Sequence, residues 1–99
     1  MKSSQRKYLR GLAHSMKPVV FVGQKGVTAS LAKAIDEALD THELIKVKFV
    51  EFKEKARKTA ITAQIEKDSG AVLAGLIGHT AILYRPHRDP EKRRIQLPD

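Results

Sequence analysis

The segment from Val19 to Thr28 limits the fold most, because it changes from an apolar run to a glycine-bracketed loop and then to a helix start. Val19-Val20-Phe21-Val22 is short, β-branched and aromatic, which predicts a strand with both faces covered. Gly23-Gln24-Lys25-Gly26 follows, and Thr28 is a good helix N-cap residue. The chain is therefore expected to pass from a strand through a tight turn into a helix.

The loop from Gly23 to Gly26 has the features of a phosphate-binding turn. Glycine has no Cβ atom, so another backbone can approach closely, and Lys25 brings a cation with three donors. Residues 28–31 contain no Asp or Glu that would occupy the positive end of the following helix. A plain tight turn is the alternative, because glycine is common in turns for conformational reasons alone.

The basic residues are concentrated near this loop in the sequence. The formal net charge is +8, and residues 1–35 contain seven basic residues and no Asp or Glu. A field of one sign attracts polyanions, of which nucleic acid is the commonest for a soluble protein. A solubilising basic surface is the alternative interpretation.

The first helix is predicted from Ser3 or Ser4, as the cap, to about Met16. Its buried stripe is expected to consist of the apolar residues at helical spacing, Leu9, Leu12, Ala13 and Met16. The opposite side is expected to carry cations, namely Arg6, Arg10, His14 and Lys17, with Lys7 beside them. Gly11 costs a helix interior about 1 kcal/mol relative to Ala, so we expect close packing against a strand there.

The remaining elements follow from the same patterns. Helices are predicted over 28–42 and 53–69, and strands over 44–50, 71–77 and 80–85. Lys46 and Lys48 alternate with apolar residues, so one face of their strand is expected to be exposed to solvent, as at the side of a sheet. Residues 1–99 are expected to form a single domain with a basic, Pro-containing tail over about 86–99, mostly extended, with a short strand at 94–97.

The sequence has no features that favour catalysis or a cofactor. It contains no cysteine, its four histidines show no metal-ligand spacing, and neither a P-loop nor a dinucleotide motif is present. We therefore expect no enzyme activity, metal or cofactor, although a ribonuclease site assembled from distant residues stays an alternative. No apolar run reaches membrane-spanning length, and we expect a cytoplasmic monomer.

The aromatic residues are Tyr8, Phe21, Phe49, Phe52 and Tyr84. Their positions in the predicted elements indicate mainly core roles. Stacking of nucleobases on an aromatic platform is therefore expected to be minor.

Several segments together resemble the CRM (chloroplast RNA splicing and ribosome maturation) domain family, in particular its stand-alone bacterial members of YhbY type. The matching segments are Arg10-Gly11-Leu12-Ala13-His14, Lys17-Pro18-Val19-Val20, Gly23-Gln24-Lys25-Gly26-Val27-Thr28, the run from His42 to Lys48, the run from Ile77 to Pro86, and Ile95-Gln96-Leu97-Pro98. They extend over essentially the whole chain. Residues 51–58 match the family pattern least clearly.

The resemblance implies an α+β fold of two layers with the order α-β-α-β-α-β-β. It implies a four-stranded mixed sheet similar to the C-terminal domain of translation initiation factor 3, and RNA binding through the loop and the adjoining basic surface during assembly of the large ribosomal subunit. The loop also resembles that of KH domains, which clamp the nucleic-acid backbone. That the polyanion is RNA rather than DNA follows from the resemblance alone.

The sequence therefore predicts a non-enzymatic RNA-binding protein whose partner is ribosomal RNA or a precursor of the large subunit. The predicted contact residues are Gly23, Gln24, Lys25, Gly26 and Thr28, extended electrostatically by Arg6, Lys7, Arg10 and Lys17. A protein-interaction factor, whose basic face meets an acidic partner without contacting RNA, is the alternative from another class.

Overall fold

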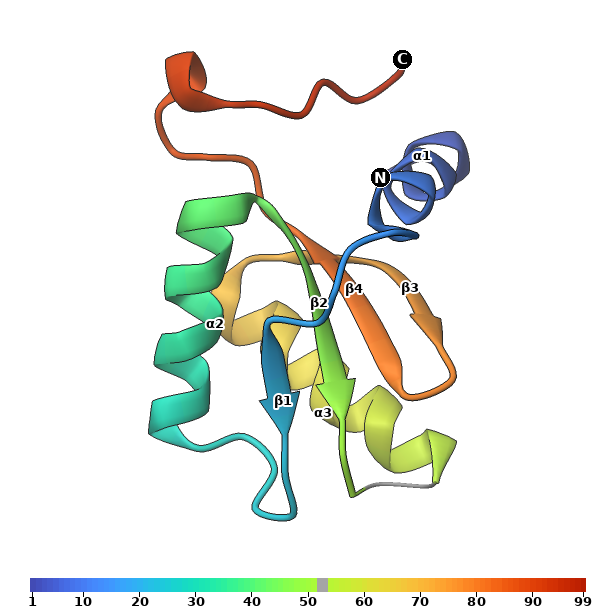
Figure 1. The fold of residues 1–99 in the computed structure, drawn as a ribbon, viewed down its shortest axis with the longest axis vertical. Coiled ribbons are helices and arrows are strands. Elements are labelled where there is room, and N and C mark those ends of the chain that lie inside the picture. Colours follow the sequence, from blue (N-terminus) through green and yellow to red (C-terminus); the bar gives the residue numbers. More distant parts are fainter. Residues whose placement is uncertain (52–53) are drawn as a thin grey trace.

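The computed structural model describes residues 1–51 and 54–99. These residues form α1 (Ser3–Ala13), β1 (Val20–Val22), α2 (Ala29–His42), β2 (Leu44–Phe49), α3 (Lys55–Ser69), β3 (Val72–Ile77) and β4 (Thr80–Tyr84), followed by the 3₁₀ turn η1 (Pro90–Lys92) (Figure 1). The predicted element order is confirmed. The predicted start of the third helix at residue 53 and the core role of Phe52 lie outside the described residues.

The strands form one mixed sheet in the order β1-β2-β4-β3. β1 and β2 are parallel, with Val20 opposite Val47, whereas β4 is antiparallel to both of its neighbours. The mixed four-stranded sheet is therefore confirmed. One detail differs: β2, with its two lysines, lies inside the sheet, whose two edge strands are β1 and β3.

Two separate cores lie on opposite faces of this sheet. α2 and α3 cover one face, where Ile35, Leu39 and Ile65 pack against the buried side chains of the strands. On the other face Leu9 and Ala13 of α1 pack with Ala74, Ile82 and Tyr84, and the tail residues Ile95 and Leu97 close this second core. α1 and the tail thus add a partial third layer to the expected two.

The tail is mostly extended, as predicted, but its expected strand at 94–97 does not form. η1 is its one regular element among the described residues. Ile95 and Leu97 make apolar contacts with the second core instead of joining the sheet. Packing rather than backbone pairing therefore holds the end of the chain.

α1 differs from its prediction in three respects. It ends at Ala13, and its N-cap is Lys2, whose backbone N–H donates to the Gln5 side chain at 3.0 Å, so neither serine caps it. Leu12 is 40% exposed rather than buried. A Cβ atom added at Gly11 would meet no atom of the described residues within 4 Å, so the close packing expected there does not occur.

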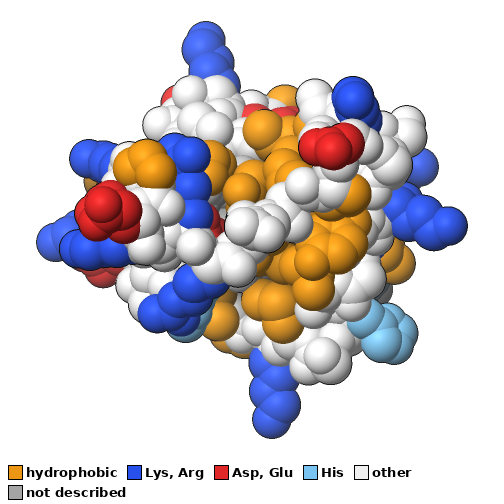
Figure 2. All heavy atoms as spheres, turned by 90° about the horizontal axis from the view of Figure 1, so that it is seen from above, with side chains coloured by type: hydrophobic (Ala, Val, Ile, Leu, Met, Phe, Trp, Pro, Cys, Tyr) orange, Lys and Arg blue, Asp and Glu red, His pale blue; other side chains and the backbone are white. Residues whose placement is uncertain are grey.

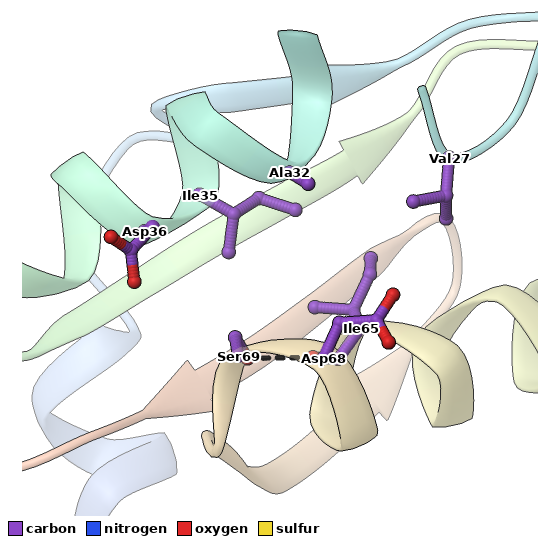
Figure 3. Close-up of a pocket in the computed structure, with 7 residues that line it drawn as sticks. All are labelled: Val27, Ala32, Ile35, Asp36, Ile65, Asp68 and Ser69. Atoms are coloured by element: carbon purple, nitrogen blue, oxygen red, sulfur yellow. Dashed lines mark hydrogen bonds between the residues drawn. The ribbon is translucent and has the colours of Figure 1, made fainter. Parts of the chain in front are cut away.

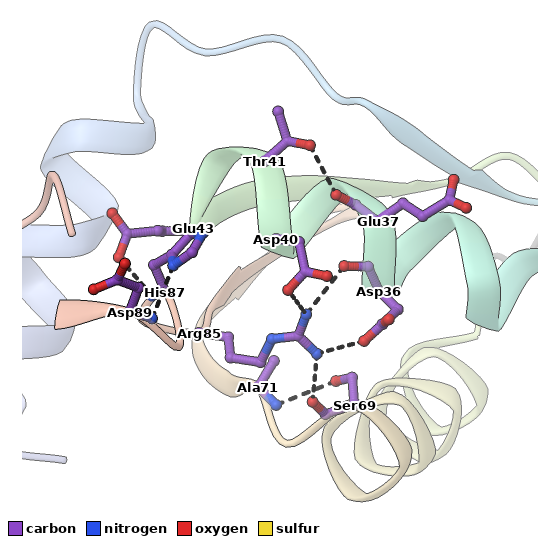
Figure 4. Close-up of polar contacts among 10 residues, drawn as sticks. All are labelled: Asp36, Glu37, Asp40, Thr41, Glu43, Ser69, Ala71, Arg85, His87 and Asp89. Atoms are coloured by element: carbon purple, nitrogen blue, oxygen red, sulfur yellow. Dashed lines mark hydrogen bonds and ion pairs between the residues drawn. The ribbon is translucent and has the colours of Figure 1, made fainter. Parts of the chain in front are cut away.

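Arg85, directly after β4, joins the two helices of the first core (Figure 4). Its guanidinium donates to the carboxylates of Asp36 and Asp40 in α2 at 2.7 and 2.9 Å, and to the Ser69 carbonyl of α3 at 2.8 Å. Hydrogen bonds to charged groups are stronger than neutral ones. These contacts fix the C-terminal ends of both helices against the sheet.

Glu43, between α2 and β2, anchors the tail (Figure 4). It is buried with a left-handed φ of 62°, and its carboxylate accepts the backbone N–H groups of His87 at 2.8 Å and Arg94 at 2.7 Å. Burial alone raises the pKa of Glu43, but the amide donors of Arg94, His87 and Ile95 lower it, and the net pKa lies below its ordinary value. The carboxylate is therefore held charged beneath the tail.

Among the described residues, no helix combines the length and the apolar character needed to cross a membrane.

Candidate nucleic-acid interface

The loop between β1 and α2 is a closed four-residue turn. The Gly26 N–H donates to the Gly23 carbonyl at 3.0 Å, and Gly26 has a φ of 67°, in the left-handed region that suits glycine. Gln24 and Lys25, at the tip, are exposed. A Cβ atom added at Gly23 would meet no atom within 4 Å in the described part of the chain, so the structure leaves open space there for an approaching backbone.

The N-terminus of α2 opens beside this turn. Thr28 is its N-cap, as predicted, and the Thr28 hydroxyl accepts the Leu31 N–H at 3.1 Å. The first turn contains no acidic residue, so the positive end of the helix dipole is not neutralised from within. The Leu31 amide is used by the cap, which leaves the earlier amides of the first turn for an outside anion.

Arg6 and Arg10 do not lie on a solvated basic face, which corrects the predicted side of α1. Arg6 Nε donates to the Leu73 carbonyl at 3.2 Å, and an Arg10 terminal nitrogen donates to the Ala74 carbonyl at 2.9 Å. Both arginines are half-buried. They attach α1 to β3, and Gly75 leaves room beneath Arg10, because a Cβ atom there would lie 2.7 Å from Arg10 Cδ.

Lys7 and Lys17 are exposed, but neither adjoins the loop. α1 lies at the upper right of Figure 1, and Lys17 follows it before the start of β1, whereas the loop is at the bottom. The structure therefore brings Gly23, Gln24, Lys25, Gly26 and Thr28 together and places Arg6, Lys7, Arg10 and Lys17 elsewhere. Their proposed contacts with RNA stay predictions.

Basic side chains are not confined to the loop end. Figure 2 views the molecule from the opposite end, where Lys and Arg side chains project on several sides around a hydrophobic strip. Basic side chains are therefore exposed at this end of the molecule as well as at the loop.

Two aromatic residues expected in the core are on the surface. Phe21 is 56% exposed and Tyr8 is 42% exposed. In β1 only Val20 and Val22 point into the first core, so the prediction that both faces of this strand are covered was wrong. The alternation of lysines in β2 was the signal that this face of the sheet is partly open.

A small apolar crevice lies between α2 and α3, behind the loop (Figure 3). It is lined by Val27, Ala32, Ile35, Asp36, Ile65, Asp68 and Ser69. Its volume is about 120 Å³, which is below the roughly 300–1,000 Å³ of small-molecule sites. The crevice is better explained by imperfect packing of two helices.

The histidines have local structural roles where their contacts are defined. The His79 ring lies 3.3 Å from the Lys58 ammonium, and the His87 ring accepts the Asp89 N–H at 3.0 Å. Within residues 1–51 and 54–99, no group of three or more His, Cys, Asp or Glu side chains is placed to hold a metal ion.

Comparison with known proteins gives consistent matches. The family model described as the CRS1 / YhbY (CRM) domain matches residues 1–85. A Haemophilus influenzae protein named RNA-binding protein is 39% identical over 99% of this chain and 95% of its own length. The Bacillus subtilis protein named Probable RNA-binding protein YqeI is 35% identical over 99% of both chains. The solution structure of SAV1595 from Staphylococcus aureus matches 99% of both chains with a TM-score of 0.83 and 28% identity.

Proposed function

Because the chain belongs to the CRS1 / YhbY (CRM) domain family, we propose that it binds RNA by gripping the sugar-phosphate backbone at the loop from Gly23 to Gly26. The observation that carries this proposal is the closed turn beside a Thr28-capped helix whose first turn has no acid. Relatives named as RNA-binding proteins support RNA as the polyanion.

The loop supplies three kinds of group for a phosphate. Lys25 provides a mobile cation, Gln24 provides an amide donor, and the start of α2 provides backbone amides with a favourable dipole. Such contacts recognise the backbone rather than the base edges, so this site fixes the position of the strand and carries little sequence information.

We further propose that the bound RNA is ribosomal RNA, or a precursor particle of the large subunit, and that the protein acts as a cytoplasmic monomer without catalysis. The support for the ribosomal partner is the resemblance of the loop, the run from His42 to Lys48 and the run from Ile77 to Pro86 to the YhbY type. Crosslinking in cells followed by sequencing of the attached RNA tests this directly. We expect the sequenced fragments to concentrate on precursor RNA of the large subunit. An even distribution over messenger RNA would overturn the proposal.

The loop itself is tested by Lys25→Glu, with Lys92→Glu in η1 as the matched control. Both residues are exposed, both changes alter the charge equally, and η1 lies at the end of the molecule opposite the loop (Figure 1). Lys25→Glu should weaken binding to ribosomal RNA at least about tenfold at moderate salt, while Lys92→Glu changes it little. Neither change should lower the melting temperature.

Two results would point to the other functions. If the purified protein has no affinity for RNA but shows salt-sensitive association with an acidic protein, the docking function replaces RNA binding. If the pure protein cleaves labelled RNA, and Lys25→Glu does not alter the cleavage, a ribonuclease site elsewhere must be sought.

A further inference from the structure

The second face of the sheet is only half covered. α1 and the tail pack on β3, β4 and the start of β2, around Leu44 and Tyr84. Towards the other end of the strands, a row of four neighbouring residues crosses the sheet on this face, namely Phe21, Lys48, Thr80 and Ile77. We call these four residues the open sheet face.

The open sheet face combines apolar and cationic side chains. Phe21 is 56% exposed and Ile77 is 60% exposed, and Lys48, directly opposite Phe21 in the parallel register, is exposed between them. The Lys48 ammonium makes no hydrogen bond or ion pair with any residue in the described part of the chain. Single exposed apolar residues are ordinary, but here an exposed aromatic ring and an exposed ammonium come from paired positions on neighbouring strands.

A shallow groove borders this face on the side of α1. It is lined by Arg10, His14, Lys46, Ile77, Thr80 and Ile82. Lys46 is held by the carbonyls of His14 at 3.3 Å and Met16 at 2.9 Å, and so fixes the turn after α1. None of the described residues that line the groove or form the open sheet face is acidic, so no carboxylate among them would repel an anion.

The open sheet face also lies between the loop and Arg10, which is one of the α1 residues that the sequence suggested for RNA. At one end Phe21 precedes Gly23 of the loop by two residues, a distance of about 7 Å along a strand. At the other end Thr80 and Ile77 adjoin Arg10 in the groove. A single strand of nucleic acid that is held at the loop and runs towards α1 would therefore pass over the Phe21 ring.

We propose that the open sheet face is a base-stacking surface for single-stranded RNA, in which an unpaired nucleobase stacks on Phe21 and Lys48 meets the adjoining phosphate. Aromatic rings stack on any base, because every base has a π-face. The inference rests on the proposed grip at the loop and adds the bases to it, since the loop contacts only the backbone. It also predicts a preference for unpaired over double-stranded RNA, whose bases are not available for stacking.

The sequence contains no tryptophan, which allows a direct test. Phe21→Trp and Tyr8→Trp each introduce one reporter at an exposed aromatic position, on the open sheet face and on α1 respectively. The probes are short single-stranded oligoadenylate and an abasic oligomer with the same sugar-phosphate backbone. Oligoadenylate should quench the tryptophan fluorescence of Phe21→Trp, whereas the abasic oligomer should not. Neither probe should quench the tryptophan fluorescence of Tyr8→Trp.

Affinity measurements complete the test. Phe21→Ala should weaken oligoadenylate binding at least about fivefold and leave abasic binding unchanged, whereas Tyr8→Ala should alter neither. Lys25→Glu should weaken the binding of both probes, because it removes a contact with the sugar-phosphate backbone that the two probes share. Phe21 is exposed, so Phe21→Ala should keep the melting temperature of the parent protein.

The outcomes separate this inference from the proposed function. Suppose that Lys25→Glu weakens oligoadenylate binding, that Phe21→Ala does not, and that oligoadenylate leaves the fluorescence of Phe21→Trp unchanged. The stacking surface is then refuted, while RNA binding at the loop is retained. If the parent protein binds neither probe nor ribosomal RNA, both proposals fail. If Phe21→Ala keeps its RNA affinity but abolishes a concentration-dependent dimer, the open sheet face is a contact between copies of the chain, and stacking is overturned.

Discussion

Arg10 of α1 lies directly over Gly75 of β3, and a Cβ atom on Gly75 would be 2.7 Å from Arg10 Cδ. The contact is with the stem of the arginine, whose guanidinium is held by the Ala74 carbonyl. The side chain is therefore tied at its far end, which limits how far its stem can move aside. The glycine that allows close packing between α1 and the sheet is in the strand, not in the helix.

Gly75→Ala should accordingly destabilise the protein, whereas Gly11→Ala should stabilise it. Overpacking of this kind costs about 1–3 kcal/mol, and Ala is favoured over Gly in a helix by up to about 1 kcal/mol. Gly11 is the matched control, because its added Cβ would have no atom of residues 1–51 or 54–99 within 4 Å. Urea denaturation measures both changes. Equal free energies of unfolding for the two variants would contradict the assigned packing.

Arg6 and Lys7 are sequence neighbours with separate predicted effects. Arg6→Ala should lower the free energy of unfolding by about 1–2 kcal/mol, because it removes the charged donor to the Leu73 carbonyl. Lys7→Ala should change it by less than about 0.5 kcal/mol, since Lys7 is exposed. Thermal and urea unfolding of the two variants decide this, and a larger loss in Lys7→Ala would refute the attachment of α1 to β3 through Arg6.

The ionisation of Glu43 should make the free energy of unfolding depend on pH. Its pKa in the folded protein lies below the ordinary value of 4.5, so its contribution is complete above that value and is lost as the pH falls through the folded pKa. Glu43→Gln should be less stable than the parent by about 1.5–3 kcal/mol at neutral pH. The difference should shrink on acidification below 4.5.

Denaturation of the parent and Glu43→Gln across this pH range measures that difference. Asp99→Asn, at an exposed position in the same tail, controls for the general effect of removing a carboxylate. A difference that stays constant from neutral to acid pH would show that the Glu43 carboxylate is not charged in the folded state.

RNA binding should depend steeply on salt, and Lys25 should account for part of the slope. The logarithm of the binding constant falls linearly with the logarithm of salt concentration as phosphate contacts release counterions. Lys25→Ala should reduce the magnitude of that slope by about 1, while Lys92→Ala leaves it unchanged. Titrations at several salt concentrations test this, and an unaltered slope in Lys25→Ala would remove the lysine from the phosphate contacts.

Local features could be predicted well from the sequence. Thr28 caps α2 and Gly70 ends α3 in the left-handed conformation, because both effects involve only residues within one turn of the helix. The strands predicted over 71–77 and 80–85 form as the antiparallel pair β3 and β4, with Gly78 at the turn between them. Element order depends on such signals, and the family resemblance supplied the sheet.

The errors concern partners that are distant in sequence. From the sequence, Arg6 and Arg10 resemble a solvated basic face. In the structure they donate to carbonyls of β3, which lies more than sixty residues later in the chain. Phe21 looks like a core residue until the extent of α1 is known, because α1 and the tail determine which half of the sheet is covered. Helical or strand periodicity reports that a side is apolar, but it does not report what lies against that side.

The tail anchored by Glu43 sets a physical boundary for the domain. A chain trimmed after Arg85 would leave the Glu43 carboxylate without the His87 and Arg94 amide donors and would remove Ile95 and Leu97, which pack against the second core. Recombinant fusions and tandem arrangements of this domain should therefore attach their linker after Leu97. The final residues are therefore part of the folded domain through packing and hydrogen bonds, although they belong to no strand and no long helix.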